Sequence, residues 1–213
     1  MTRIMFATPA LGGNLTCKFT ESLIQTLFLL KDKQINSRVF LKKSSSLLIA
    51  ERNSVLSAFM KSDCSHLMCI DSDMGWSGED VLKLLNHDEP IVGACYLTRD
   101  KKYIVRLKED VPLLNDKGLF EADAIPMGFC MLRRDAIQEM QDYFPDLYYR
   151  SGEYEAYGLF NTMVRDQEFW GEDFSFFLRA GDAGLKVWVD PSIELIHATE
   201  KGKIEDALNL RKE

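Results

Sequence analysis

The sequence predicts an α/β protein with a central, mostly parallel sheet and helices on both of its faces. Through the first half of the chain, short apolar runs alternate with segments of helical spacing. The connections are short enough for strand–helix–strand units, which place successive strands parallel. The composition, 46% hydrophobic and 28% charged over 213 residues, is that of one ordinary globular domain.

The first half supplies this alternating pattern. We expect strands over residues 4–7, 35–41, 67–70 and 91–94. A helix is expected over 17–31, where Phe19, Leu23, Leu27 and Leu30 share one side. Further helices are expected after the capping serines Ser44–Ser46 and near 78–86.

The pattern changes after Tyr96. Residues 97–118 are charged and irregular, and the elements expected beyond them are strands over 120–125, 127–132, 187–189 and 193–196 and helices over 135–143 and 172–182. Residues 145–170 form an aromatic-rich loop that either lines a binding cleft or packs on the core. The charged end, 200–213, is expected to be a terminal helix or a tail.

The bulk properties favour an enzyme of the cytoplasm. The five cysteines are scattered and contain no Cys-x-x-Cys pair, which indicates free thiols in a reducing compartment. No apolar stretch is long enough to span a membrane, and no signal peptide is expected. The net charge of −7 argues against non-specific attraction to nucleic acid.

The most informative stretch is residues 66–76. An apolar run ends at Asp71 and Asp73, with Ser72 between them, and Gly75 then allows a turn. Open α/β sheets bind ligands at the carboxyl ends of their strands. Two carboxylates at one point suit Mg²⁺ or Mn²⁺, ions that usually also hold a phosphate. The stretch therefore predicts an enzyme with a metal-bound, phosphate-bearing substrate.

A second constellation lies near the end of the chain. Glu172 and Asp173 follow Trp170 and Gly171 at the start of a helix, where acids either cap the helix or serve as a general base facing a cleft. His197 lies at the end of another apolar strand, just as Asp71 lies at the end of the strand over 67–70. Two aspartates and this histidine could together complete one metal site with open positions for a diphosphate.

These motifs, taken together, resemble those of glycosyltransferases with the GT-A fold. The resemblance is carried, in chain order, by residues 48–53, Asp71-Ser72-Asp73, residues 90–96, Gly171-Glu172-Asp173-Phe174, residues 184–191 and His197. It spans residues 1–197 and implies a Rossmann-like GT-A domain over 1–213. In that interpretation 1–96 bind the nucleotide-sugar, 97–199 bind the acceptor and 200–213 form a tail. Short, single-domain relatives of this kind are frequent in viruses and bacteria, which is consistent with a phage origin.

The resemblance also implies roles for individual residues. Asp71 and Asp73 would hold Mn²⁺ or Mg²⁺ on the donor diphosphate, and His197 would complete the metal site. Asp173 would be the base that acts on the acceptor, with Glu172 beside it, and Trp170 and Gly171 would lie on the acceptor side. The residues implied to contact the donor are Thr8, Pro9, Arg52, Asp71, Ser72 and Asp73.

The implied reaction moves a sugar from a nucleotide-sugar to a hydroxyl, with inversion if Asp173 is the base. The charge of −7 favours a saccharide or another small hydroxylated acceptor; the alternative is a hydroxymethylated base in phage DNA, with the enzyme in the host cytoplasm.

Three other classes of protein share parts of this pattern with a glycosyltransferase. An Asp-x-Asp phosphatase would carry its motif on the first strand, and here two strands precede it. A nucleotidyltransferase would show a basic, Gly-rich loop where this chain has Leu11-Gly12-Gly13-Asn14. A non-catalytic nucleotide- or sugar-binding protein of the same fold would not need both constellations.

Overall fold

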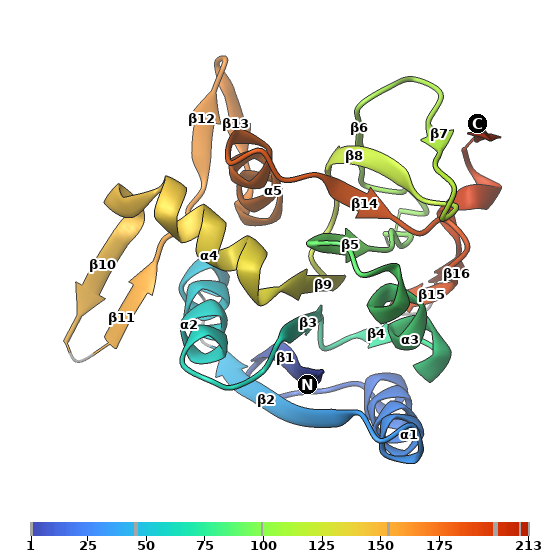
Figure 1. The fold of residues 1–213 in the computed structure, drawn as a ribbon, viewed down its shortest axis with the longest axis horizontal. Coiled ribbons are helices and arrows are strands. Elements are labelled where there is room, and N and C mark those ends of the chain that lie inside the picture. Colours follow the sequence, from blue (N-terminus) through green and yellow to red (C-terminus); the bar gives the residue numbers. More distant parts are fainter. Residues whose placement is uncertain are drawn as a thin grey trace.

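The structure, a computed structural model, describes residues 2–44, 47–98, 100–152, 154–197, 200–208 and 210–212. It is a mixed α/β fold around one eight-stranded sheet (Figure 1). In spatial order the strands are β2 (Asn36–Ser44), β1 (Arg3–Leu11), β3 (His66–Ile70), β9 (Phe129–Arg133), β5 (Ile91–Gly93), β14 (Val187–Val189), β8 (Phe120–Ala124) and β6 (Arg106–Leu107).

The sheet is mostly parallel, as the sequence predicts. Strands β9 and β8 run opposite to the other six. Strand β9 lies between β3 and β5, so a strand from the second half of the chain separates two strands from the first half. The two halves therefore share one sheet.

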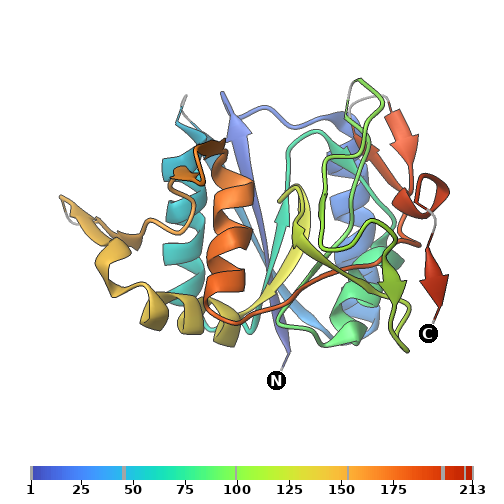
Figure 2. The same cartoon turned by 90° about the horizontal axis from the view of Figure 1, so that it is seen from above.

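Helices cover both faces of this sheet, which confirms the layered prediction (Figure 2). One face carries α1 (Cys17–Asp32) and α3 (Gly78–His87); the other carries α2 (Leu48–Met60), α4 (Arg134–Tyr143) and α5 (Glu172–Asp182). Alternate residues of β1 serve the two layers: Ile4 and Phe6 pack in the α1 layer, and Met5 and Ala7 in the α2 layer. The sheet thus has a hydrophobic core on each side.

Local signals explain where two of the helices begin. The Thr16 hydroxyl accepts a hydrogen bond from the Phe19 backbone and caps α1. At α3, Ser77 and Asp80 form a reciprocal capping box. The expected serine cap of α2 is wrong, because Ser44 belongs to β2 and the helix begins after Leu47 without a side-chain cap. Ser45 and Ser46 lie outside the described residues.

The first strand is longer than the sequence predicts. Strand β1 continues through Thr8 and Pro9 to Leu11, so these two residues do not mark its end. Its pairing with β2 supports this extension as far as Ser44, whereas its pairing with β3 stops at Ala7. The missing N–H of Pro9 is tolerated because β3 no longer pairs with β1 at that level.

The aromatic segment is not an irregular loop. It folds into a short 3₁₀ turn (Pro145–Leu147) and two hairpins, β10 (Tyr148–Ser151) with β11 (Tyr154–Tyr157) and β12 (Met163–Arg165) with β13 (Glu168–Trp170). Tyrosine rings pair across the first hairpin, Tyr148 with Tyr157 and Tyr149 with Tyr154. Figure 1 shows both hairpins extending from the body of the molecule. These four tyrosine rings therefore pack against one another within the segment itself.

A small antiparallel sheet closes the other side of the molecule. It contains β4 (Met74–Gly75), β15 (Leu195–His197) and β16 (Glu200–Gly202). A 3₁₀ turn (Ile204–Asp206) follows, and β17 (Arg211–Lys212) pairs with β7 (Leu113–Leu114). The expected terminal helix or tail is therefore wrong, since strand pairing holds this end on the fold. No helix within the described ranges is long and apolar enough to cross a membrane.

Candidate active site at the carboxyl edge of the sheet

Several chain segments meet where β3 and β5 end. Asp71 follows β3, Tyr96 lies three residues beyond β5, and the turn at Gly128 leads into β9. The Asp71 backbone donates a hydrogen bond to the Gly128 carbonyl, 3.1 Å away, which ties two of these segments together. The start of α5, with Glu172 and Asp173, lies at the same edge, as open α/β sheets require of a ligand site.

Arg52 is the centre of this cluster. Its side chain is 5% exposed and lies 3.2 Å from an Asp71 oxygen, 3.1 Å from Asp173 Oδ1 and 3.8 Å from Glu172. Neither Arg52 Nε nor Asp173 Oδ1 has a hydrogen bond of good geometry, so their contact is an ion pair. One buried cation thus holds together the two constellations that the sequence places about 100 residues apart.

Asn53, the next residue after Arg52, holds helix α2 in place. Asn53 is buried, donates a hydrogen bond to the Asn161 side chain and accepts one from the Phe160 backbone. Arg179 of α5 donates to the carbonyls of Leu159 and Asn161. The turn near residue 160 therefore joins α2 to α5 and fixes the distance from Arg52 to Asp173.

Burial and charge shift the ionisation of the cluster. Burial is the main influence on Asp173 and raises the pKa of its carboxyl to about 6, although Arg52 acts in the opposite direction. Burial alone would lower the pKa of Arg52, but Asp173 and Asp71 more than offset this and raise it. Asp173 thus has a pKa suited to a general base near neutral pH.

Asp73 and His197 form a second pair. Strand β15 places His197 opposite Met74, so the imidazole Nε2 lies 3.5 Å from an Asp73 oxygen. The other nitrogen, Nδ1, donates to the Leu97 carbonyl over 2.9 Å. The hydrogen bond with Asp73 raises the pKa of His197. This arrangement orients Nε2 towards Asp73, as outer hydrogen bonds orient the histidine ligands of metals.

The potential ligand atoms in this region are of the types that bind a divalent ion. Carboxylate oxygens and one imidazole nitrogen are ligands that Mn²⁺ accepts. Asp71, however, is engaged by Arg52 and by the Tyr96 hydroxyl, 3.4 Å from its second oxygen. Across the described ranges no three His, Cys, Asp or Glu side chains are grouped closely enough to hold an ion. An ion held by Asp73 and His197 would need further oxygens from a bound ligand.

The remaining residues expected to contact the donor, Ser72, Thr8 and Pro9, lie at different places in the fold. The Ser72 carbonyl accepts hydrogen bonds from the Thr16 backbone and hydroxyl, and so anchors the start of α1. Thr8 is 1% exposed inside β1, whereas Pro9 is partly exposed. If the β1–β3 register is continued past Ala7, Pro9 lies level with Asp71. Of this pair, only Pro9 is partly exposed.

Tyr96 and Gly128 are site residues to which the sequence assigned no role. Burial is the main cause that raises the pKa of Tyr96 well above its usual value, so its hydroxyl remains protonated and donates to Asp71. A Cβ at Gly128 would lie 2.7 Å from an Asp71 oxygen and even closer to the Tyr96 hydroxyl. Only glycine permits this close approach. The Gly between two apolar residues in the predicted strand-turn was the available signal.

A pocket of about 290 Å³ opens beside this cluster. Glu172 and Asp173 line it together with Gly171, and Tyr96 and His197 also face it. Trp170 does not line the pocket; its ring stacks on that of Phe174, which does. The structure therefore brings the predicted base, its neighbour, Gly171 and His197 to one cavity.

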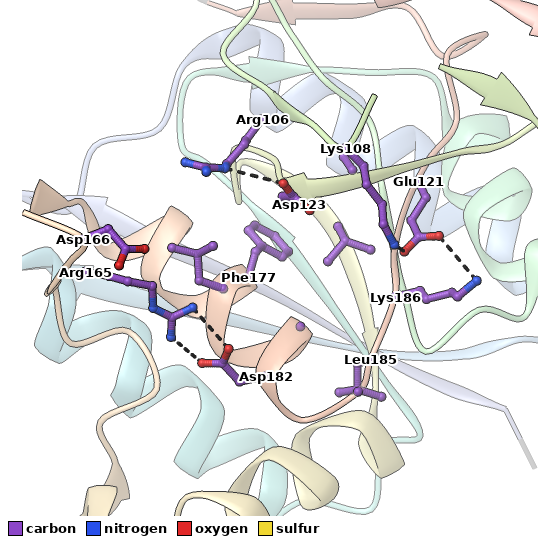
Figure 3. Close-up of a pocket in the computed structure, with 15 residues that line it drawn as sticks. Arg106, Lys108, Glu121, Asp123, Arg165, Asp166, Phe177, Asp182, Leu185 and Lys186 are labelled. Atoms are coloured by element: carbon purple, nitrogen blue, oxygen red, sulfur yellow. Dashed lines mark hydrogen bonds and ion pairs between the residues drawn. The ribbon is translucent and has the colours of Figure 1, made fainter. Parts of the chain in front are cut away.

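A larger pocket, about 520 Å³, lies between α5 and the β6–β8 side of the sheet (Figure 3). Its charged rim is internally paired: Arg106 with Asp123, Lys108 and Lys186 with Glu121, and Arg165 with Asp182. None of the predicted site residues lines it. The predicted site residues that reach a pocket therefore gather at the smaller one.

The sequence matches no family model and no curated protein. Among solved structures, the chain is similar to A197 from STIV, with a TM-score of 0.55 and 16% identity over 94% of this chain and 87% of that one. This likeness establishes a shared fold. Its TM-score is 0.46 both with GalNAc-T7, solved with UDP, GalNAc and Mn²⁺, and with TarS 1-349 from S. aureus.

The latter two matches are weaker. Identity is 10% over 92% of this chain for GalNAc-T7 and 12% over 88% for TarS. The chain spans only 43% and 58% of those two proteins, respectively. A shared fold does not define a reaction, which depends on the residues of the site itself.

Proposed function

We propose that this protein is a glycosyltransferase with a GT-A-like fold. In this proposal it moves a sugar from a nucleotide-sugar to an acceptor hydroxyl with the aid of a divalent ion. The observation that carries the proposal is the convergence of Asp71, Glu172 and Asp173 on buried Arg52, beside the Asp73–His197 pair and a small pocket. One end of this site suits a diphosphate and the other suits a hydroxyl that loses a proton.

The donor end would be built from the predicted residues. Asp73 and His197 would hold Mn²⁺ or Mg²⁺ together with the diphosphate, and Asp71 would join them. The ion would neutralise negative charge on the leaving oxygens. Pro9 would border the nucleoside, Thr8 would support it from within the strand, and Ser72 would hold the loop between the two aspartates.

The acceptor end would depend on Asp173. Its Oδ2 accepts a hydrogen bond from the Met127 backbone at 2.9 Å, which fixes the carboxylate at the pocket wall. With a pKa of about 6 it is ionised at neutral pH and can take the proton of an incoming hydroxyl. Direct attack by that hydroxyl would invert the anomeric centre. Glu172, on the same wall, is the alternative base.

The decisive experiment is a thermal-shift panel of UDP, GDP, CDP, ADP and dTDP, each with and without Mn²⁺. We expect one nucleotide to stabilise the protein, and only with the ion. Asp73→Asn should abolish this stabilisation, while the exposed-pair control Asp182→Asn should retain it. Stabilisation that is independent of the ion, or unaffected by Asp73→Asn, would refute the metal role. The nucleotide identified then defines the donor for a transfer assay.

The role of the base needs a separate measurement. Asp173→Asn should leave donor binding nearly unchanged and lower turnover by roughly 10²–10⁴-fold, because a general base acts on the acceptor. A parallel loss of nucleotide binding and turnover would place Asp173 in the donor site instead.

A further inference from the structure

The pocket beside Asp173 has the size of a site for a single ring. At about 290 Å³ it lies at the lower end of the range for small-ligand pockets. It extends from the Glu172–Asp173 carboxylates towards Tyr96 and His197. A ligand ring held here would touch both the proposed base, Asp173, and the donor end of the site.

One wall of this pocket is a stacked aromatic layer. The Trp170 and Phe174 rings are nearly parallel, with an interplanar angle of 9° and centroids 6.0 Å apart. The Arg106 guanidinium lies 4.5 Å from the centroid of Trp170. Trp170 packs against Phe174 and does not line the pocket, so Phe174 is the ring of this layer that a ligand could contact.

The layer behind Phe174 is held firmly. The Ser175 hydroxyl donates to the Trp170 carbonyl and accepts from the Met163 backbone, so the β12–β13 hairpin is tied to α5. Arg106 is fixed by Asp123 at 3.5 Å and by Glu168 at 3.9 Å (Figure 3 shows the first of these pairs). A pre-organised aromatic wall of this kind loses little entropy on binding.

The other lining groups narrow the ligand chemistry. Ile104 and Pro126 add apolar surface, while Glu172 and Asp173 supply hydrogen-bond acceptors. None of the described residues lining the pocket is a lysine or arginine, the side chains on which binding of a nucleic-acid phosphate backbone mainly depends. An apolar face combined with several hydroxyl donors is the chemistry of a pyranose ring.

We propose that this pocket binds a single pyranose ring of the acceptor. Its C–H face would lie against Phe174, and its hydroxyls would donate to Glu172 and Asp173. The assignment to the acceptor rests on the proposed glycosyltransferase activity; the pyranose specificity rests on the pocket itself.

The test is saturation-transfer NMR with methyl pyranosides of glucose, galactose, mannose and N-acetylglucosamine, without nucleotide. We expect at least one glycoside to bind, with saturation strongest on the protons of one ring face. Phe174→Leu should weaken binding about tenfold, and Phe174→Tyr should restore it. The matched control is Phe169→Leu, because Phe169 lies five residues upstream and is 70% exposed.

Specific outcomes would overturn the proposal. If 5-hydroxymethyl-2′-deoxycytidine bound in a Phe174-dependent manner and no glycoside did, the ligand would be a nucleobase. Binding that Phe174→Leu leaves unchanged would remove the aromatic wall from the site. Displacement of the glycoside by a nucleotide-sugar but not by its nucleoside diphosphate would make this the donor-sugar pocket.

The same data separate this inference from the proposed function. Phe174-dependent glycoside binding by a protein that transfers no sugar would refute the transferase and support the pyranose pocket. Sugar transfer that does not depend on Phe174 would support the transferase and refute the pocket assignment.

Discussion

At the scale of single residues, Arg52 determines how the acids of the site behave. Its buried charge attracts Asp71 and Asp173, which would otherwise repel each other across the site. Burial nevertheless prevails at Asp173 and keeps its pKa at about 6. The site thus contains a carboxylate that is ionised at neutral pH but retains more affinity for a proton than an exposed one.

The pH dependence of turnover follows from this pKa. A base must be deprotonated to act, so we expect kcat/KM for the acceptor to fall as pH drops through about 6, tenfold for each further unit. An initial-rate profile between pH 4.5 and 8 at saturating donor measures it. A flat profile across pH 5–7 would contradict this role for Asp173.

Removal of the Arg52 charge tests the cluster directly. Arg52→Met leaves the carboxylates of Asp71 and Asp173 without their buried partner, so we expect a loss of about 3–5 kcal/mol in the free energy of unfolding. Because Arg52 lowers the pKa of Asp173, the acid limb of the rate profile should also move to higher pH. Urea titration measures the stability, with exposed Arg150→Met as the control. A cost below about 1 kcal/mol would show that the cluster is solvated.

At the scale of elements, pairing between short strands positions the residues that could bind a metal ion. The register of β15 with β4 sets His197 opposite Met74 and therefore next to Asp73. Antiparallel β9 brings Gly128 against Asp71. Helices α2 and α5 deliver Arg52 and Asp173 from one side of the sheet, and the turn near residue 160 holds them at a fixed distance.

Helix α3 offers a test of stability that is separate from function. Ser77→Ala removes one side of its capping box and should cost about 1 kcal/mol of unfolding free energy. None of the proposed site residues lies on this helix, so donor-dependent thermal stabilisation and turnover should stay within about twofold of the parent protein. Urea unfolding and initial rates measure the two effects. Loss of turnover at unchanged stability would place α3 in the catalytic machinery.

At the scale of the whole molecule, one sheet supports both hydrophobic layers. Strands from both halves of the chain alternate within it, as β3, β9, β5 and β14 do. Residues such as Phe129 and Leu132 of β9 are fully buried between neighbours from the first half. Neither half retains a complete core without the other.

Unfolding should therefore be a single transition. We expect urea curves from far-UV circular dichroism and from tryptophan fluorescence to coincide, because Trp76 and Trp188 report on the same cooperative structure. Leu132→Ala should shift both curves together and cost about 2–5 kcal/mol. Separate midpoints for the two probes would show that the halves unfold independently.

The sequence by itself determined the local features of this protein. Hydrophobic periodicity located the helices at 17–32, 134–143 and 172–182 to within a residue or so, and it marked the strands that end at Asp71 and near His197. These predictions succeed because an amphipathic helix and a buried strand leave a repeating pattern in the residues that form them. Asp71, Asp73, Asp173 and His197 became candidates because they lie at the ends of such elements, whereas Arg52 was a candidate only through the resemblance to GT-A glycosyltransferases.

Only the tertiary structure decided how these residues are paired. Insertion of β9 into the sheet, the β4–β15 contact and the burial of Arg52 join segments roughly 20 to 120 residues apart, and no local pattern encodes such contacts. The extension of β1 past Pro9 and the hairpins within 145–170 likewise depend on partner strands. The pKa of Asp173 depends on burial and on neighbouring charges, which exist only once the chain has folded.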